Sequence, residues 1–247
     1  MADRTTLVCL PFAGAGASFY RPWQRHAEPL GLDVLPLQLP GRERLIDEEP
    51  FRDAHAAADS LHADLLTALA PATGPHRVAL FGHSLGAVLA YELARRLATT
   101  PDIRLVRLFA SGSPHPAEPR AARATGLDDD AFLARVNEFA GYTDEALDDP
   151  ELRELVLPTL RADVEMHESY VPADDRLLSV PVTTLRGTAD TLVGRAEAEA
   201  WDRTTDAGHR HAELDGGHMY LTESAPALLR VVAEELAQSV EGAELCV

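Results

Sequence analysis

Residues 77–86 read Arg-Val-Ala-Leu-Phe-Gly-His-Ser-Leu-Gly, and a stretch with helical character, Ala87 to Leu97, follows them directly. The first five residues are mostly apolar and predict a buried strand, so Ser84 falls in a tight turn between a strand and a helix. A G-x-S-x-G sequence in that context is typical of a turn that exposes a serine nucleophile. Gly82 and Gly86 suit the turn because it brings backbone close to backbone. The helix behind the serine directs its N-terminal amides toward the reacting centre.

On both sides of this turn, apolar strand candidates alternate with amphipathic helix candidates. The predicted strands are Thr6–Leu10, Asp33–Leu37, Arg77–Phe81, Ile103–Ala110, Val182–Arg186 and His209–Leu214. The predicted helices are Phe51–Leu69, Leu85–Ala98, Ala196–Asp202 and Ala225–Gln238. The alternation predicts a doubly wound, mostly parallel sheet flanked by helices. With the serine turn it indicates the α/β-hydrolase fold, and we expect residues 1–247 to form a single domain.

The segment from about Pro114 to Ser179 interrupts the alternation, because it offers no strand between two strands that should be near neighbours. It predicts helices at Asp128–Ala140 and Asp149–Tyr170, and we expect Pro158 to kink or split the second helix. A helical insertion at this place in the order predicts a lid over the active site, at about residues 114–179. The alternative is an additional pair of packing helices, although a proline-interrupted, acid-rich composition suits a mobile cover better.

Composition and charge exclude several classes of protein. The formal net charge is -18, and the 22 basic residues are all arginine and spread along the chain, which argues against a nucleic-acid partner. Cys9 and Cys246 provide neither a disulfide framework nor metal-ligand spacing, which favours a cytoplasmic protein without a metal. The chain shows no signal peptide and no stretch of 18 apolar residues, so we expect no membrane association.

A serine hydroxyl needs a base to take its proton and an acid to orient that base. In this fold the three groups follow in the order serine, acid, histidine, each on a loop after a strand. Of the ten histidines, His218 is the expected base because it lies in a glycine-rich loop between the last strand and the last helix. Of the others, His209 and His211 are expected on the surface of that strand and His83 against the pocket. His115 and His167 lie in the insertion, where they could touch substrate.

Asp190 is the expected acid, because a Gly-x-x-Asp turn at the end of a predicted strand delivers a carboxylate to the catalytic edge of the sheet. Its alternative role is to cap the next helix. Asp215 is the next candidate, although it stands only three residues before His218. Asp163 and Asp206 are weaker candidates, since no strand end positions them.

The negative charge that develops on a substrate oxygen needs two main-chain amides. One is expected from Leu85, directly after the serine, and one from the small-residue loop Pro11–Ser18 after the first strand. In that loop Ala13 is the expected donor and Phe12 the alternative. The same loop does not fit a dinucleotide-binding motif, because Phe19 stands where that motif needs its third glycine.

Several motifs resemble the stand-alone type II thioesterases that accompany polyketide and nonribosomal peptide synthases, and the resemblance spans essentially the whole chain. It is carried by residues 10–18, 38–44, 81–87 and 157–163, by the Gly-x-x-Asp at Asp190 and by the Gly-Gly-His at His218. Phe12 departs from the family, which often has histidine there. We expect this to alter the pocket wall and leave the chemistry intact, because the donor required at that place is a main-chain amide.

The resemblance implies a serine hydrolase that removes acyl groups from the phosphopantetheine arm of acyl or peptidyl carrier proteins, an editing role in biosynthesis. Ser84 would attack the thioester, His218 would take and return the proton, Asp190 would orient His218, and the Ala13 and Leu85 amides would hold the oxyanion. No cofactor or metal is implied. The alternatives are a carboxylesterase or lipase on the same fold and a non-catalytic accessory protein that binds carriers.

The acidity of the chain conflicts with an acidic partner. Carrier proteins are usually acidic, so a chain with a formal charge of -18 would repel one unless its docking face is locally apolar or rich in arginine. The candidates for such a face are Arg42, Arg44, Arg120, Arg123 and Arg161. The chain begins at its first strand and ends soon after its last helix, which fits the free-standing type.

Overall fold

A computed structural model describes residues 4–69, 74–118, 123–140 and 149–244. Six strands, all paired in parallel, form one sheet in the order β2-β1-β3-β4-β5-β6. The strands are β1 Thr5–Leu10, β2 Leu32–Pro36, β3 His76–His83, β4 Ile103–Ser111, β5 Val182–Gly187 and β6 His209–Leu214. Each predicted strand is present within two residues of its expected bounds, and the predicted doubly wound parallel sheet is confirmed.

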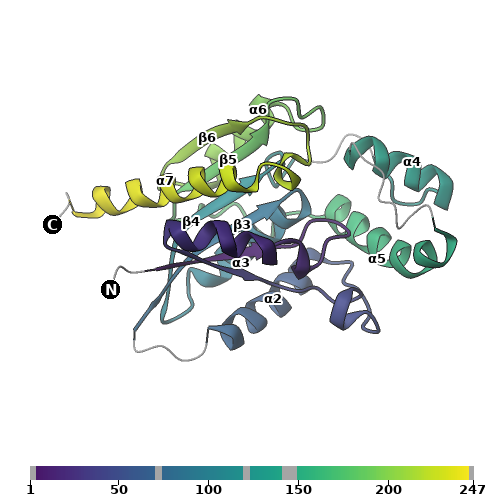
Figure 1. Cartoon of the computed structure of the whole chain (residues 1–247), viewed down its shortest axis with the longest axis horizontal. Helices are drawn as coiled ribbons and strands as arrows, with labels where there is room; N and C mark the ends of the chain where they lie inside the picture. The colour runs from purple at the N-terminus through teal and green to yellow at the C-terminus, as the bar shows by residue number, and fades with distance from the viewer. Residues whose placement is uncertain (1–3, 70–73, 119–122, 141–148, 245–247) are drawn as a thin grey trace.

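Helices cover both faces of the sheet. On one face pack α2 (Ala54–Ala68) and α3 (Leu85–Leu97), and on the other pack the short α1 (Gln24–Ala27) and the long α7 (Ala225–Glu244). Figure 1 shows α7, in yellow, running along the sheet toward the side where both termini lie. Strands buried on both faces are built from nearly continuous apolar runs, which explains why the sequence showed them clearly.

The central strand β3 illustrates how the core is divided. Side chains alternate between the faces of a strand. Val78 and Leu80 therefore pack with α2 and α3, whereas Ala79 and Phe81 pack with α1 and α7. All four are fully buried. The strand is thus held from both sides up to the point where the serine turn begins.

The segment between β4 and β5 contains α4 (Asp129–Ala140) and α5 (Pro150–Ser169), and α6 (Arg195–Glu199) follows β5. Figure 1 places α4 and α5 together at one end of the molecule, opposite the two termini. The predicted splitting of the second helix is wrong, because α5 continues through Pro158. Pro158 is exposed, while Leu157 and Thr159 on either side of it are buried. Packing of these neighbours supports the helix despite the missing amide.

Replacement of Pro158 tests this explanation. Pro158→Ala restores a helical amide and removes a ring that crowds the preceding turn, so we expect the free energy of unfolding to rise by about 1–3 kcal/mol. The control is Pro150→Ala at the first turn of the same helix, where proline is favoured and no gain is expected. Urea denaturation measures both. A loss of stability in Pro158→Ala would mean that the packing of α5 depends on the proline.

Candidate active site

The turn between β3 and α3 holds Ser84 in a strained backbone conformation, with φ 53° and ψ -116°. A Cβ at Gly82 would lie 1.9 Å from the Gly86 carbonyl oxygen, and a Cβ at Gly86 would lie 2.6 Å from the Leu10 carbonyl oxygen. Close backbone approach therefore requires both glycines. Leu85 is the first residue of α3, so its amide lies at the helix N-terminus, where it has no acceptor within the helix.

Asp190 and His218 meet beyond the carboxyl ends of β5 and β6. The Asp190 Oδ2 lies 2.9 Å from the His218 Nδ1, and the Asp190 side chain is fully buried. Its Oδ1 accepts hydrogen bonds from the amides of Leu192 and Val193. Burial acts to raise the pKa of Asp190, but the hydrogen bond and charge of His218 and the two amides outweigh it, so the pKa is lowered. The carboxylate is ionised and engages Nδ1, which leaves the His218 Nε2 for another partner.

The loops that carry these two residues are joined to each other. The Ala189 amide donates a hydrogen bond to the Gly216 carbonyl oxygen at 2.9 Å. The buried guanidinium of Arg186 donates to the carbonyl oxygens of Asp190 at 2.9 Å and Val193 at 3.0 Å. The acid is therefore fixed relative to the histidine loop by main-chain contacts. It does not cap the next helix, because α6 has Gly194 at its N-cap.

Ser84 and His218 line the same cavity, whose volume is about 90 Å³. The rest of its wall is mostly apolar, with Val136 of α4 and Leu160 and Val164 of α5 opposite the serine turn. The structure thus brings the predicted nucleophile and base together under the two helices of the inserted segment. Such an apolar, partly enclosed space with a few polar groups is typical of a small-molecule site.

The loop after β1 supplies another wall of this cavity. Ala13 lines it, as the sequence predicts. The next amide, that of Gly14, donates to the Asp163 Oδ2 at 2.8 Å, and the Ala15 amide donates to the Phe12 carbonyl oxygen at 2.9 Å. Among the residues that the structure describes, the amides of Phe12 and Ala13 have no acceptor. Both predicted alternatives for the second oxyanion donor therefore remain available.

A buried row of polar groups supports the His218 ring, and of these groups only His83 was expected near the pocket. The His83 Nδ1 lies 2.9 Å from the Ser111 Oγ, which lies 2.7 Å from the Tyr220 hydroxyl. The His83 ring packs against His218 with centroids 4.7 Å apart. Gly112, with φ 52°, makes room for this packing, since a Cβ there would lie 2.4 Å from the His83 ring. The sequence feature that could have indicated this row is the pair Ser111-Gly112, directly after the predicted strand Ile103–Ala110.

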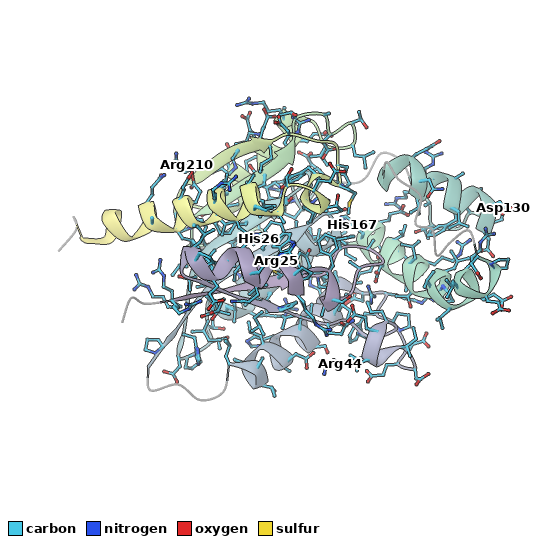
Figure 2. The ribbon with its side chains drawn as sticks, viewed as in Figure 1. Arg25, His26, Arg44, Asp130, His167 and Arg210 are labelled. Carbon is cyan, nitrogen blue, oxygen red and sulfur yellow. The ribbon has the colours of Figure 1, made fainter. Side chains whose placement is uncertain are left out.

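Two further residues contribute to the walls. Phe12 lines the cavity and packs edge-on against His83, with ring centroids 5.9 Å apart. Phe12 therefore forms part of the pocket wall. His167 also lines the cavity, from the end of α5 that meets the sheet, and Figure 2 shows it beside the sheet while Asp130 lies far out on α4.

Arg42 and Asp163 form a buried ion pair between the loop after β2 and α5. The two guanidinium NH groups donate to the two carboxylate oxygens at 2.7 Å each, and the side chains are 7% and 0% exposed. The expectation that Arg42 belongs to a docking face is therefore wrong, because burial removes it from the surface. Arg161 pairs with Asp129 and stacks on the Phe132 ring. Arg120 lies outside the described residues.

The other candidates lie apart from this constellation. His211 was expected at the surface, but its side chain is 7% exposed and its Nδ1 lies 2.9 Å from the Thr184 Oγ1. That prediction is wrong because His211 lies on the side of β6 that faces Thr184 of β5, where the ring is covered, whereas Arg210 on the other side is exposed. Asp206 and Asp215 are exposed. His115 lines a smaller neighbouring cavity, which shares His167 and Glu168 with the cavity at Ser84.

The described part of the chain has neither a metal-binding cluster nor a helix that could span a membrane. Its residues include no group of three or more histidine, cysteine, aspartate or glutamate side chains placed to bind a metal ion. None of its helices has the length and apolar character needed to cross a membrane.

Comparisons with known proteins agree with this geometry. Residues 5–236 match the family model described as a thioesterase domain. The probable cadicidin biosynthesis thioesterase of Streptomyces griseus is 36% identical over 236 residues, which is 95% of this chain and 63% of that protein. This chain thus spans just under two thirds of that relative. The thioesterase PikA5 of Streptomyces venezuelae is 32% identical over 230 residues, 93% of this chain and 80% of that protein.

A solved structure supports the same relationship. The type II thioesterase BorB from the borrelidin biosynthetic cluster superposes with a TM-score of 0.79 at 34% identity, covering 96% of this chain and 93% of BorB. The match therefore extends over nearly the whole length of both chains.

The lowered pKa of Asp190 predicts how stability depends on pH. A carboxyl group whose folded-state pKa lies below the ordinary 3.8 stabilises the protein above that pH, and the contribution is lost as the pH falls through the folded-state pKa. We expect the excess of wild type over Asp190→Asn in free energy of unfolding to decrease progressively as the pH falls from about 5 to 3. Urea denaturation from pH 3 to 8 measures this, with the exposed Asp215→Asn as control. A difference that does not change over this range would contradict the prediction.

Proposed function

This chain belongs to the thioesterase family, and from that premise we propose that it hydrolyses acyl thioesters held on the phosphopantetheine arm of acyl or peptidyl carrier proteins. The role would be editing, the release of acyl groups that block a polyketide or nonribosomal peptide synthase. The observation that carries the proposal is the shared apolar cavity of Ser84 and His218, with the ionised Asp190 behind the histidine.

Ser84 is the proposed nucleophile and His218 its base. The strained turn presents the serine at the cavity, and the His218 Nε2 is the ring nitrogen left over once Nδ1 engages Asp190. As the Ser84 oxygen attacks the thioester carbon, His218 takes the hydroxyl proton. Asp190 then stabilises the imidazolium and keeps the ring in the productive orientation.

The attack places a negative charge on the former carbonyl oxygen. We assign the stabilising donors to the amides of Leu85 and Ala13, the first at the N-terminus of α3 and the second in the wall of the same cavity. The N-terminal end of α3 adds the positive end of its dipole. Donors held by the backbone need no reorganisation when the charge develops, which makes this kind of stabilisation effective.

The intermediate collapses when the carbon–sulfur bond breaks. His218 returns its proton to the departing thiolate, which leaves the arm as a free thiol and Ser84 as an acyl ester. A water molecule then gives a proton to His218 and its oxygen attacks the ester carbon. Breakage of the bond to Ser84 releases the carboxylic acid, and the proton on His218 restores the serine hydroxyl.

The inserted segment is proposed as the lid of this site, within a single domain. Its helices supply Val136, Leu160 and Val164 to the wall opposite Ser84. A second cavity of about 470 Å³ shares Val136, Leu160, Phe12 and Ala13 with the first. We propose that acyl chains too long for the smaller space extend along this shared apolar wall.

The rival functions differ in substrate or in the use of the site. An esterase or lipase would use the same three residues, and the family match favours a thioester instead. A non-catalytic carrier-binding protein would not need an ionised acid behind a histidine that shares a cavity with a strained serine. Hydrolysis is therefore the better supported function.

Loss of the nucleophile tests the proposal. Ser84→Ala should lower kcat for a short acyl thioester, on a carrier protein or on free pantetheine, by at least about 10⁴-fold, while the fold persists. The control is Ser179→Ala at an exposed position, which should retain wild-type activity. Mass spectrometry of the acyl-carrier before and after incubation measures turnover. Equal activity of Ser84→Ala and wild type would refute the assignment, and faster hydrolysis of oxygen esters would favour the esterase.

The carrier-docking face is proposed to include Arg44 and Arg123, which are exposed. Replacing both by glutamate should raise KM for the acyl-carrier by about tenfold and leave the small pantetheine thioester unaffected, because only the acidic carrier meets that surface. Arg25→Glu is the control. Figure 2 shows Arg25 near the middle of the view, below α7, and Arg44 at the lower edge of the molecule. Equal losses on both substrates would contradict the docking role.

A further inference from the structure

The buried pair of Arg42 and Asp163 holds the loop that carries the proposed second oxyanion donor. Asp163 Oδ2 accepts a hydrogen bond from the Gly14 amide at 2.8 Å, in addition to the one from Arg42. The same guanidinium NH group donates to the Ala15 carbonyl oxygen at 3.0 Å. The residues on the carboxyl side of Ala13 are thus fixed by charged groups that come from two other parts of the chain.

Other contacts fix the rest of the loop but leave Ala13 out. The Tyr20 hydroxyl donates to the Leu10 carbonyl oxygen at 3.0 Å, and the Ala17 amide donates to the Gln38 side chain at 3.0 Å. Gly14 has φ 79°, a conformation that turns the chain sharply directly after Ala13. The direction of the Ala13 amide therefore depends on where Gly14 is held.

We propose that Asp163, with Arg42 as its counter-ion, is a positioning residue for the oxyanion hole and sets the direction of the Ala13 amide through the Gly14 N–H···Oδ2 hydrogen bond. The inference rests on the proposed function. Asp163 does not line the cavity at Ser84, so it is not a catalytic residue. It also binds Gly14 with a charged acceptor, which makes the hydrogen bond stronger than a neutral one.

This assignment explains why an ion pair is placed where an apolar contact would suffice for stability. The desolvation cost of a buried pair commonly offsets its attraction, so a pair such as this is weak support for a purely stabilising role. Apolar side chains of similar size would fill the same space but would leave the Gly14 amide without an acceptor. Compared with an apolar contact, the ion pair additionally fixes the position of the loop after β1.

The pair also joins α5 to the loop. Asp163 lies on the inserted helix, and Thr159, one turn earlier, donates to the Gly41 carbonyl oxygen at 2.6 Å. The oxyanion hole is then complete only when α5 is docked against the loops after β1 and β2. Displacement of α5 would remove the acceptor of the Gly14 amide.

Two variants test the proposal with the full chain and a short acyl-pantetheine thioester. Asp163→Asn keeps the shape but leaves Arg42 buried without its counter-charge, which is strongly destabilising. The double variant Arg42→Met/Asp163→Leu removes both charges and is expected to fold. In either variant that folds, kcat should fall about 10²–10³-fold, as for loss of one oxyanion donor, with KM changed less than about threefold.

A transition-state analogue separates positioning from general destabilisation. An acyl trifluoromethyl ketone forms an oxyanion with Ser84, so its affinity should fall in parallel with kcat. A thioether analogue forms no oxyanion, and its affinity should stay within threefold of wild type. The matched control is Arg107→Met/Glu235→Leu, which removes a buried ion pair between β4 and α7. It should leave kcat and both affinities unchanged.

The outcomes are distinguishable. Unchanged kcat in the double variant overturns the positioning role, and so does a fall in kcat that is matched by the Arg107/Glu235 control or accompanied by an equal loss of thioether affinity. If wild type hydrolyses the thioester and Ser84→Ala does not, such a result refutes this inference alone. If Ser84→Ala is as active as wild type, the proposed function itself fails.

Discussion

The close approach of three backbone segments at the serine turn is the constraint on which the structure depends. Gly82 and Gly86 touch within the turn, and Gly86 also lies against the carbonyl oxygen of Leu10 at the end of the neighbouring strand. The start of α3 is thereby pressed against β1 and β3 together. The loop after β1, which begins at Pro11, leaves the sheet beside the N-terminus of α3. The two glycines thereby bring together the two segments whose Ala13 and Leu85 amides we propose as the oxyanion donors.

Much of this arrangement can be predicted from local sequence patterns. The inner strands β1, β3 and β4 contain apolar runs that are buried on both faces. The sequence marks the ends of all six strands within two residues, although the edge strand β6 is polar and partly exposed. Ser84, Asp190 and His218 each lie at or shortly after the end of a predicted strand, and parallel strands bring their carboxyl ends to a common edge. The expected contact between His218 and Asp190 therefore required only that β5 and β6 be neighbours. The His218 Nδ1 and the Asp190 Oδ2 lie 2.9 Å apart.

What the sequence did not predict depends on contacts between distant segments. Arginine is usually a surface residue, and Arg42 is buried only because α5 brings Asp163 against it. The alternation of a strand suggested that His211 faces solvent, but its ring folds onto Thr184 of the adjacent strand. Proline ordinarily interrupts a helix, but α5 continues through Pro158 because its neighbours Leu157 and Thr159 are packed in the interior. In each case tertiary packing overrode a local pattern.

The ion pair that joins α5 to two loops limits how the inserted segment can change in evolution and how it can be exchanged between related proteins. A segment that covers a pocket is ordinarily the easiest part of a fold to exchange, because it makes few contacts with the scaffold. Here α5 cannot be exchanged alone, because Asp163 on this helix contacts Arg42 and Gly14 in two other segments. A helix transplanted from another protein would preserve the chemistry only if it carried an acid at position 163 and the recipient kept both Arg42 and Gly14. Substrate range and reactivity are thus inherited together.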